Sequence, residues 1–151
     1  MTRSILFNRT YRTTAFAFAA TLIAMAADAA VTTTPIKPGD KYYLGHNEEC
    51  VLYARRHVPS LPYGLFSAND KKKIINSHTP KAGSAAIMSI GGVWHIGVVK
   101  STDVSGSSRN ILIAEHNIPV GVKTPRYRKA TCGSKTSDCE KALSIVGYYR
   151  P

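Results

Sequence analysis

The hydrophobic and polar positions divide the chain into an apolar start, a short helical region and a longer region with the alternation of β-strands. A helix is expected after Asn47, because this residue is a good N-cap, two acids follow it, and Pro59 ends the segment. A second short helix is expected at 71–76. The three lysines that open it are interpreted as a solvated face or as a patch that faces an anionic polymer.

From residue 80 onward the pattern changes to strands. Segments 85–90 and 93–100 flank Gly91-Gly92 and predict a hairpin. Further strands are expected at 111–117, around 120–127 and at 143–149, with a polar loop at 133–138. Helices followed by a run of strands predict an α+β fold, in which the N-terminal helix packs on a mostly antiparallel sheet.

Alternation along these strands sorts their polar residues between the two faces of the sheet. His95 shares a face with Gly97, opposite to Trp94. In the next strand Glu115 and Asn117 share a face, whereas the residue between them points the other way. Glu115 and Asn117 can therefore serve the same partner on the sheet.

The apolar start predicts an export signal rather than part of the globular body. Three arginines precede an Ala-rich apolar segment at 15–27, which is too short to span a bilayer comfortably, and small residues stand at 27–29. We expect cleavage after Ala29 and a periplasmic or secreted protein; the alternative is an uncleaved anchor. Residues 30–45, rich in Thr and Pro, are expected to form an extended lead-in, and 46–151 a single domain.

The positive net charge of the chain limits the classes of partner that are expected. The 151 residues carry a formal charge of +11, and loss of three arginines and one aspartate with residues 1–29 would leave +9. Such a field favours nucleic acid, acidic lipid headgroups or the carboxylate-bearing polymers of a cell wall. Export favours the wall, and no recognisable nucleic-acid module is present. We expect no nucleic-acid partner and no membrane span in the mature chain.

The three cysteines divide into a pair and a single residue. Cys132 and Cys139 bracket the polar loop, so we expect them to form a disulfide in an oxidising compartment. Cys50 is left over. A thiol retained there is either buried and inert or kept for its chemistry.

Cys50 lies in the first turn of the expected helix if Asn47 caps it, where the helix dipole favours a thiolate. The alternative is a small core residue, because Cys50 shares one helix face with Ala54 and Val58. Thiol catalysis needs a histidine base and a polar group that orients it. His95, with Glu115 or Asn117, can fill these roles.

Zinc held by Cys50, His95 and Glu115 is chemically conceivable, but no metal-ligand motif supports it, and we expect no metal or other cofactor.

Four blocks of sequence carry a family resemblance: Glu49-Cys50-Val51-Leu52-Tyr53-Ala54-Arg55, Pro80-Lys81-Ala82-Gly83-Ser84-Ala85-Ala86-Ile87, His95-Ile96-Gly97-Val98-Val99 and Ile113-Ala114-Glu115-His116-Asn117. In order and spacing they resemble the CHAP family of cysteine- and histidine-dependent amidohydrolases and peptidases. The resemblance implies a papain-like α+β fold and cleavage of amide bonds in peptidoglycan. It implies Cys50 as nucleophile, His95 as base and Glu115 as orienting acid, with Asn117 as a further polar member.

Two residues depart from the family pattern. Many members of the family have Gln where this chain has Glu49, whose negative charge would oppose an oxyanion. Many also have Gly where Trp94 stands; Trp94 either contacts the substrate at the rim of the site or belongs to the core. The rival hypothesis is a CHAP-like module that binds wall peptides or a protein partner without cutting them. In either case we expect a monomer.

Overall fold

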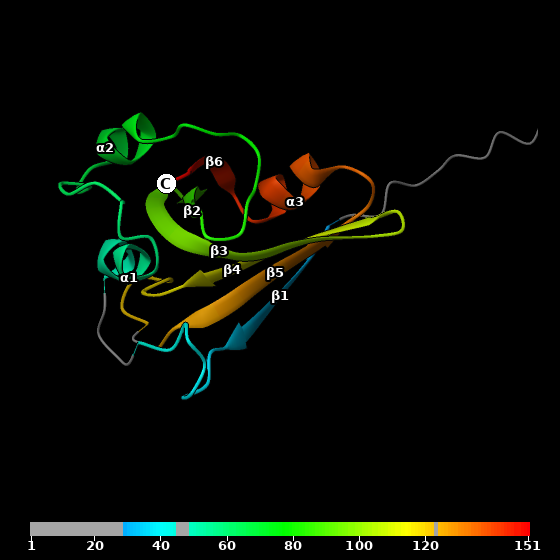
Figure 1. Ribbon diagram of the computed structural model, residues 1–151, viewed down its shortest axis with the longest axis horizontal. Helices are drawn as coiled ribbons and strands as arrows, with labels where there is room; N and C mark the ends of the chain where they lie inside the picture. Colours follow the sequence, from blue (N-terminus) through cyan, green and yellow to red (C-terminus); the bar gives the residue numbers. More distant parts are fainter. Residues whose placement is uncertain (1–28, 45–48, 123) are drawn as a thin grey trace, which may run out of the picture.

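The computed structural model describes residues 29–44, 49–122 and 124–151, which form one six-stranded sheet and three short helices (Figure 1). The strand order is β1-β5-β4-β3-β2-β6, and every neighbouring pair is antiparallel. The predicted α+β class with an antiparallel sheet is therefore confirmed. The elements in chain order are β1 (Ala30–Pro35), α1 (Cys50–His57), α2 (Ala68–Lys73), β2 (Ala85–Ile90), β3 (Val93–Ser105), β4 (Ser108–Glu115), β5 (Arg126–Cys132), α3 (Thr136–Ala142) and β6 (Ile145–Tyr149).

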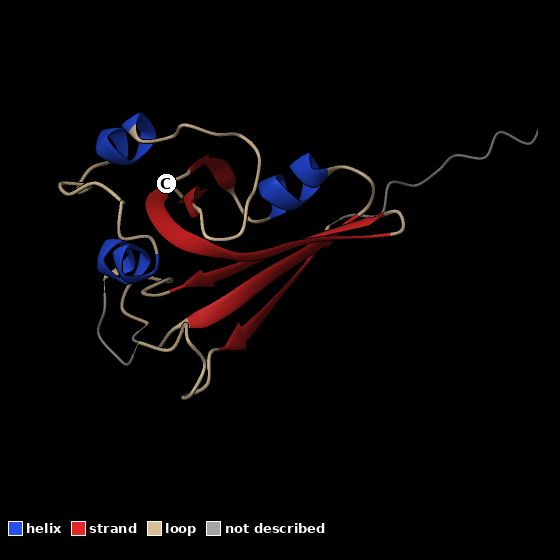
Figure 2. Ribbon diagram, in the orientation of Figure 1, coloured by secondary structure: helices blue, strands red, loops and turns tan. Residues whose placement is uncertain are grey.

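The sheet has a separate hydrophobic core on each face, because successive residues of a strand point to opposite sides. Ala85 and Ile87 of β2 pack in the core under α1, whereas Ala86 and Met88 pack in the core that includes Cys139 of α3. Helix α1 accordingly packs on one face of the sheet and α3 on the other. Figure 2 shows the three helices and the strands in the view of Figure 1. The same alternation decides which face each polar residue of β3 and β4 reaches.

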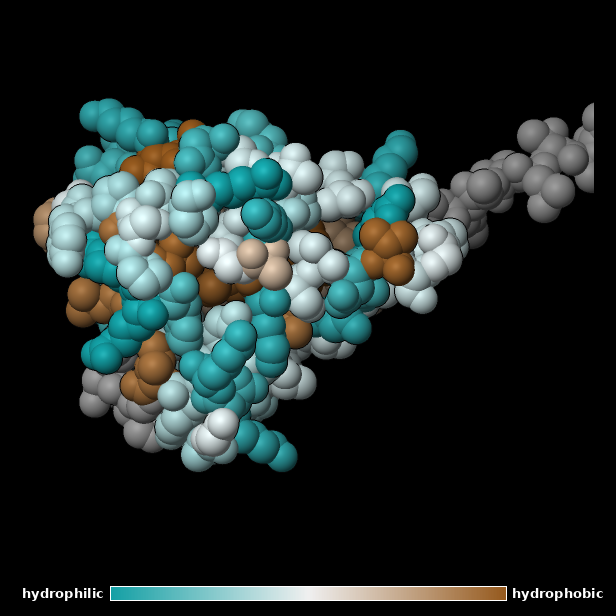
Figure 3. Space-filling view, in the orientation of Figure 1, coloured by the Kyte–Doolittle hydropathy of each residue, from teal (hydrophilic) through white to brown (hydrophobic). Residues whose placement is uncertain are grey.

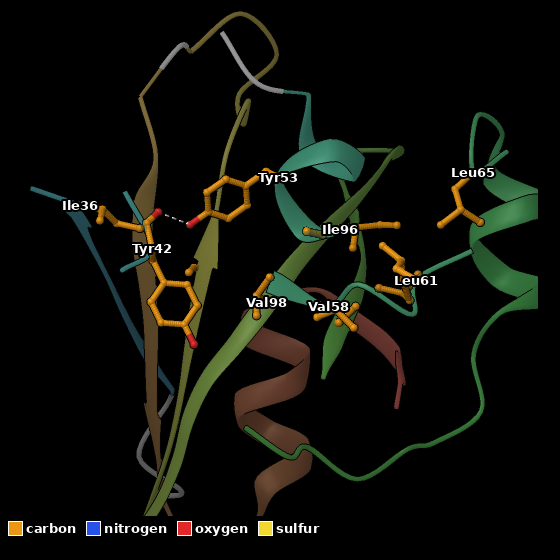
Figure 4. Close-up of a cluster of buried hydrophobic side chains, with 12 residues drawn as sticks. Ile36, Tyr42, Tyr53, Val58, Leu61, Leu65, Ile96 and Val98 are labelled. Carbon is orange, nitrogen blue, oxygen red and sulfur yellow. Dashed lines mark hydrogen bonds between the residues drawn. The ribbon is translucent and has the colours of Figure 1, made fainter. Parts of the chain in front are cut away.

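The core under α1 fixes the position of that helix (Figure 4). Tyr53 and Ala54 are fully buried, and they pack with Ile96 and Val98 of β3. The Tyr53 hydroxyl donates a 2.8 Å hydrogen bond to the backbone carbonyl of Tyr42, so this large side chain is both buried and satisfied. One turn of α1 is therefore held by packing against β3 and by a directional bond to the segment between β1 and α1.

Two predicted segments are wrong in detail. A strand was expected around 120–127, but the chain turns there: the Gly121 N–H donates to the Asn117 side chain at 2.8 Å, and the Val122 N–H to the Pro119 carbonyl at 3.0 Å. Strand β5 starts only at Arg126. The expected polar loop at 133–138 is also shorter, because α3 begins at Thr136.

The remaining segments contribute as follows. The lead-in supplies β1, an exposed edge strand that pairs with β5 along its whole length. A disulfide joins Cys132 of β5 to Cys139 of α3, with their Cα atoms 5.5 Å apart. The expected export signal and the expected cap Asn47 lie outside the described residues. Among the described residues, none of the helices has both the length and the apolar character needed to cross a membrane. The visible surface is mainly hydrophilic with scattered apolar patches (Figure 3).

Candidate active site

The candidate site lies where β3 and β4 separate. Their ladder of pairs runs from Ser105–Ser108 to Val98–Ala114 and stops there, although β3 continues back to Val93. At this end β3 pairs only with β2, and it curves strongly close to α1 (Figure 1). One edge of β3 around His95 is therefore open, and the N-terminal end of α1 occupies that position.

Cys50 is the first residue of α1. Glu49 stands at the N-cap with extended backbone, and its carbonyl accepts the first hydrogen bond of the helix, from the Tyr53 N–H at 2.9 Å. The backbone N–H groups of the first turn have no partner within the helix and favour negative charge nearby. The Cys50 sulfur contacts the His95 ring and the backbone N–H of Ile96, both on the open edge of β3.

His95 and Glu115 form the next link. Both are buried, with side chains 2% and 0% exposed, and His95 Nε2 lies 3.4 Å from Glu115 Oε2. The two atoms are close enough for ionic attraction, but their alignment does not meet the geometry of a hydrogen bond. Because Nε2 faces Glu115, Nδ1 is the ring nitrogen left for the thiol. The structure thus brings Cys50, His95 and Glu115 into one row.

Two arginines of β5 complete the environment of Glu115. Arg126 lies directly opposite Glu115 in the β4–β5 pairing, and its Nε donates a 2.9 Å hydrogen bond to Oε1. Arg128, two residues further along the same face, places a terminal nitrogen 3.6 Å from Oε2. The carboxylate of Glu115 is consequently kept ionised in a buried position.

The pKa shifts of the three groups agree with this geometry. Burial alone would raise the pKa of the Cys50 thiol, but the hydrogen bond and charge of His95, the Ile96 N–H and the charge of Lys71 together lower it. Burial disfavours the charged form of His95, yet Cys50 and Glu115 raise its pKa. Burial likewise opposes the charge of Glu115, but His95 and the two arginines lower its pKa. Both shifts act in the direction of a Cys50 thiolate beside a His95 imidazolium.

A cavity of about 430 Å³ opens beside the sulfur. Glu49, Cys50 and Arg55 line one side of it, and Lys71 of α2 lines another. Most of the remaining lining is apolar: Val51, Leu52, Tyr63, Gly64, Leu65 and Phe66. A half-buried thiol next to a concave, mainly apolar space with a few charged groups is the usual form of a small-molecule or peptide site.

Three residues singled out from the sequence lie elsewhere. The Asn117 carbonyl oxygen accepts the Gly121 N–H, so this side chain holds the turn after β4 and is not brought to His95. Trp94 is half-buried against the core under α1, with the Lys72 amine 4.8 Å from its ring, and it does not line the cavity. His116 points away from Glu115 and packs 5.7 Å from the Tyr53 ring, as alternation predicts.

Three functional candidates escaped the sequence analysis. Arg126 and Arg128 were not predicted to belong to the site, although their spacing of two residues places both on one face of a strand. Lys71 was grouped with its two neighbours as a solvated run, yet it is 7% exposed. Only the pairing of β5 with β4 and the position of α2 reveal these roles.

No protein-family model, curated protein or solved structure matches this chain.

Within residues 29–44, 49–122 and 124–151, no three His, Cys, Asp or Glu side chains are grouped so that they could hold a metal ion.

Proposed function

We propose that this protein is a cysteine amidohydrolase or peptidase of the CHAP type, with a papain-like arrangement of helix and sheet, and that it cleaves amide bonds of peptidoglycan. The observation that carries the proposal is the contact between Cys50 at the start of α1 and the buried His95, which lowers the pKa of the thiol. A cysteine that was only a core residue would not need a buried ionic partner.

In the first half of the proposed reaction, the Cys50 thiolate attacks the amide carbonyl carbon and forms a C–S bond. The developing oxyanion is stabilised by unpartnered backbone N–H groups of the first turn of α1. The C–N bond then breaks as the His95 imidazolium donates its proton to the leaving amine. The product is a thioester on Cys50 with a neutral His95.

In the second half, water replaces the amine. His95 accepts a proton from the water as its oxygen attacks the thioester carbonyl, the C–S bond breaks, and the product leaves as a carboxylic acid that gives its proton to the solvent. This restores the thiolate and the imidazolium. Glu115 stabilises the charged form of His95 in both halves and does not itself transfer a proton, since Arg126 and Arg128 hold it ionised.

The choice of peptidoglycan rests on the family resemblance, the expected export signal and the basic charge. A chain of formal charge +11 concentrates carboxylate-bearing polymers near its surface. The disulfide between Cys132 and Cys139 is of a kind that persists in oxidising compartments, in keeping with an exported protein.

The direct test is to incubate purified mature protein with peptidoglycan and to identify released fragments by mass spectrometry, which also names the bond. Cys50→Ala should stop release while preserving the melting temperature within a few degrees. His78→Gln is a matched control for variants of His95, because His78 is exposed and lines a different cavity. Release that survives in Cys50→Ala would refute the proposal.

One observation favours the second candidate, a module that binds without cutting. Glu49 is exposed and lines the same cavity as Cys50, so its negative charge faces the region where an oxyanion would form. If wild type and Cys50→Ala both leave peptidoglycan intact and both co-sediment with it, binding is the function. Glu49→Gln separates the two candidates further, because an enzyme hindered by this charge should become faster.

A further inference from the structure

Lys71 is a buried cation inside the cavity of the candidate site. Its side chain, on α2, is only 7% exposed, although lysine is among the residues least often buried. It lines the same space as Cys50, and its charge contributes to the lowered pKa of the thiol. The amine is therefore close enough to Cys50 to act on whatever binds there.

The other cations of this region are already occupied. The Arg55 guanidinium donates to the backbone carbonyls of Leu61 at 3.2 Å and Pro62 at 2.6 Å, and it stacks on the Tyr63 ring at 4.1 Å. The Lys72 amine covers the Trp94 ring. With the residues that the structure describes, the side-chain amine of Lys71 forms no hydrogen bond or ion pair, and so it is the available cation of this cavity.

The position of Lys71 is fixed by its own helix. Ser67 and Asp70 form a capping box at the start of α2: the Asp70 N–H donates to the Ser67 hydroxyl at 3.2 Å, and the Ser67 N–H to the Asp70 carboxylate at 2.9 Å. This occupies Asp70, the carboxylate nearest in sequence, with the cap. An ammonium held at the wall of a mainly apolar cavity without a protein partner favours a ligand that supplies the opposite charge.

We propose that Lys71 binds a free carboxylate of the substrate next to the amide bond that Cys50 attacks. The apolar walls, including Leu52, Leu65 and Phe66, would contact the aliphatic part of the same residue. The substrate class is thus an acidic peptide and not any accessible amide. This inference rests on the proposed function for its substrate, but the cation beside Cys50 can be tested without catalysis.

The first experiment compares alkylation of Cys50 by iodoacetate, which carries a carboxylate, and by neutral iodoacetamide. In both reactions the thiolate forms a C–S bond and iodide leaves, so a change in thiol pKa affects the two rates equally and cancels in their ratio. At neutral pH and low salt, Lys71→Met should lower the iodoacetate-to-iodoacetamide ratio about 5-fold. Lys71→Arg should retain it. Mass spectrometry confirms the site of modification.

Lys73→Met is the matched control, because it removes an exposed lysine from the same helix. A ratio that falls equally in Lys73→Met would reflect net charge and would overturn the proposal, as would an unchanged ratio in Lys71→Met. If Lys71→Met does not fold, Lys71→Gln serves the same comparison.

The second experiment uses two synthetic wall peptides that differ only by a carboxylate or a carboxamide beside the scissile bond. Wild type should prefer the carboxylate about 10-fold in kcat/KM, and Lys71→Met should lose the preference. If wild type cleaves neither peptide, the proposed function fails while the alkylation result still decides the role of Lys71. Equal cleavage of both peptides by wild type would overturn the carboxylate subsite alone.

Discussion

Side chains of strand β5 contact two carboxylates, Glu115 on one face of the sheet and Asp40 on the other. We call the groups around these two acids the Glu115 cluster and the Asp40 cluster. Arg126 and Arg128 point to one face and hold Glu115, whereas Tyr127 between them points to the other. The Tyr127 hydroxyl donates to Asp40 at 2.7 Å, and the Lys100 amine lies 3.5 Å from the same carboxylate oxygen. Each cluster thus joins one acid to donors from neighbouring strands.

The two clusters differ in burial and in what lies beyond the acid. Glu115 is fully buried and continues into His95 and Cys50, whereas the side chain of Asp40 is 28% exposed and ends at the surface. Water screens the second cluster and lets each partner find an alternative, so its loss costs little. In the first cluster every charge depends on its neighbour. The two clusters thus differ less in their residue types than in their burial and in whether a thiol lies at the end of the row of contacts.

The largest effect should follow from His95→Gln, which interrupts the buried row between Glu115 and Cys50. We expect kcat/KM on peptidoglycan fragments to fall at least about 100-fold, because general acid and base catalysis are both lost. The pH profile of Cys50 alkylation should also change. Its midpoint should lie below the ordinary pKa of a thiol in wild type, because His95 lowers the pKa of Cys50, and it should move upward in the variant. An unmoved midpoint would mean that His95 does not activate the thiol.

Glu115→Gln should have the next largest effect, because it leaves Arg126 and Arg128 partly buried without a counter-ion. Removing one partner of a buried ion pair costs about 3–5 kcal/mol. The free energy of unfolding, measured by chemical denaturation, should fall by that order. A loss below about 1 kcal/mol would show that this cluster is no more coupled than the exposed one.

The pH dependence of the same variant gives a smaller and more specific effect. Interactions with His95 and the two arginines lower the pKa of Glu115 in the folded state. A lowered pKa gives stability that is full above about 4.3, the ordinary Glu value, and is lost as pH falls through the folded value. The difference in unfolding free energy between wild type and Glu115→Gln should therefore be constant near neutral pH and shrink in acid. A difference that grew in acid would contradict this assignment.

Asp40→Asn should have the smallest effect. The Tyr42 N–H, the Tyr127 hydroxyl and Lys100 lower the pKa of Asp40, but the group is exposed. The loss of stability should stay below about 1 kcal/mol and should diminish with added salt. Activity should not change. A large loss of activity would erase the distinction between the two clusters.

Local sequence signals predicted the elements that are locally determined. The β2–β3 hairpin follows from Gly91 and Gly92, which both adopt positive φ angles of 56° and 84° that favour glycine. The second helix was expected at 71–76, and its existence is confirmed, but the capping box of Ser67 and Asp70 starts α2 three residues earlier, at Ala68. The strand predicted around 120–127 lies too early in the chain, since β5 begins at Arg126. The charged residues of β5 find their partner on another strand, which no local pattern shows.

In the candidate site, too, local patterns predicted some features and missed those that depend on distant parts of the chain. Alternation grouped His95 with Gly97 and Glu115 with Asn117 on the faces of their own strands, since each choice depends only on neighbours in the strand. It could not show that β3 and β4 separate at Val98 and Ala114, which is what admits Cys50 from a helix on the other face. Nor could it distinguish Lys71 from Lys73, because burial within a run of like residues is decided by the packing of α2 and not by composition.

The separation of β3 and β4 has a consequence for when the protein can react. Cys50 and His95, the proposed nucleophile and base, belong to distant segments of the chain, and they meet only where α1 packs against the open end of β3. An unfolded chain therefore carries an ordinary thiol, with no histidine beside it. Under the proposed function, the protein would be inert until it is folded, because the contact that lowers the pKa of the thiol exists only in the fold.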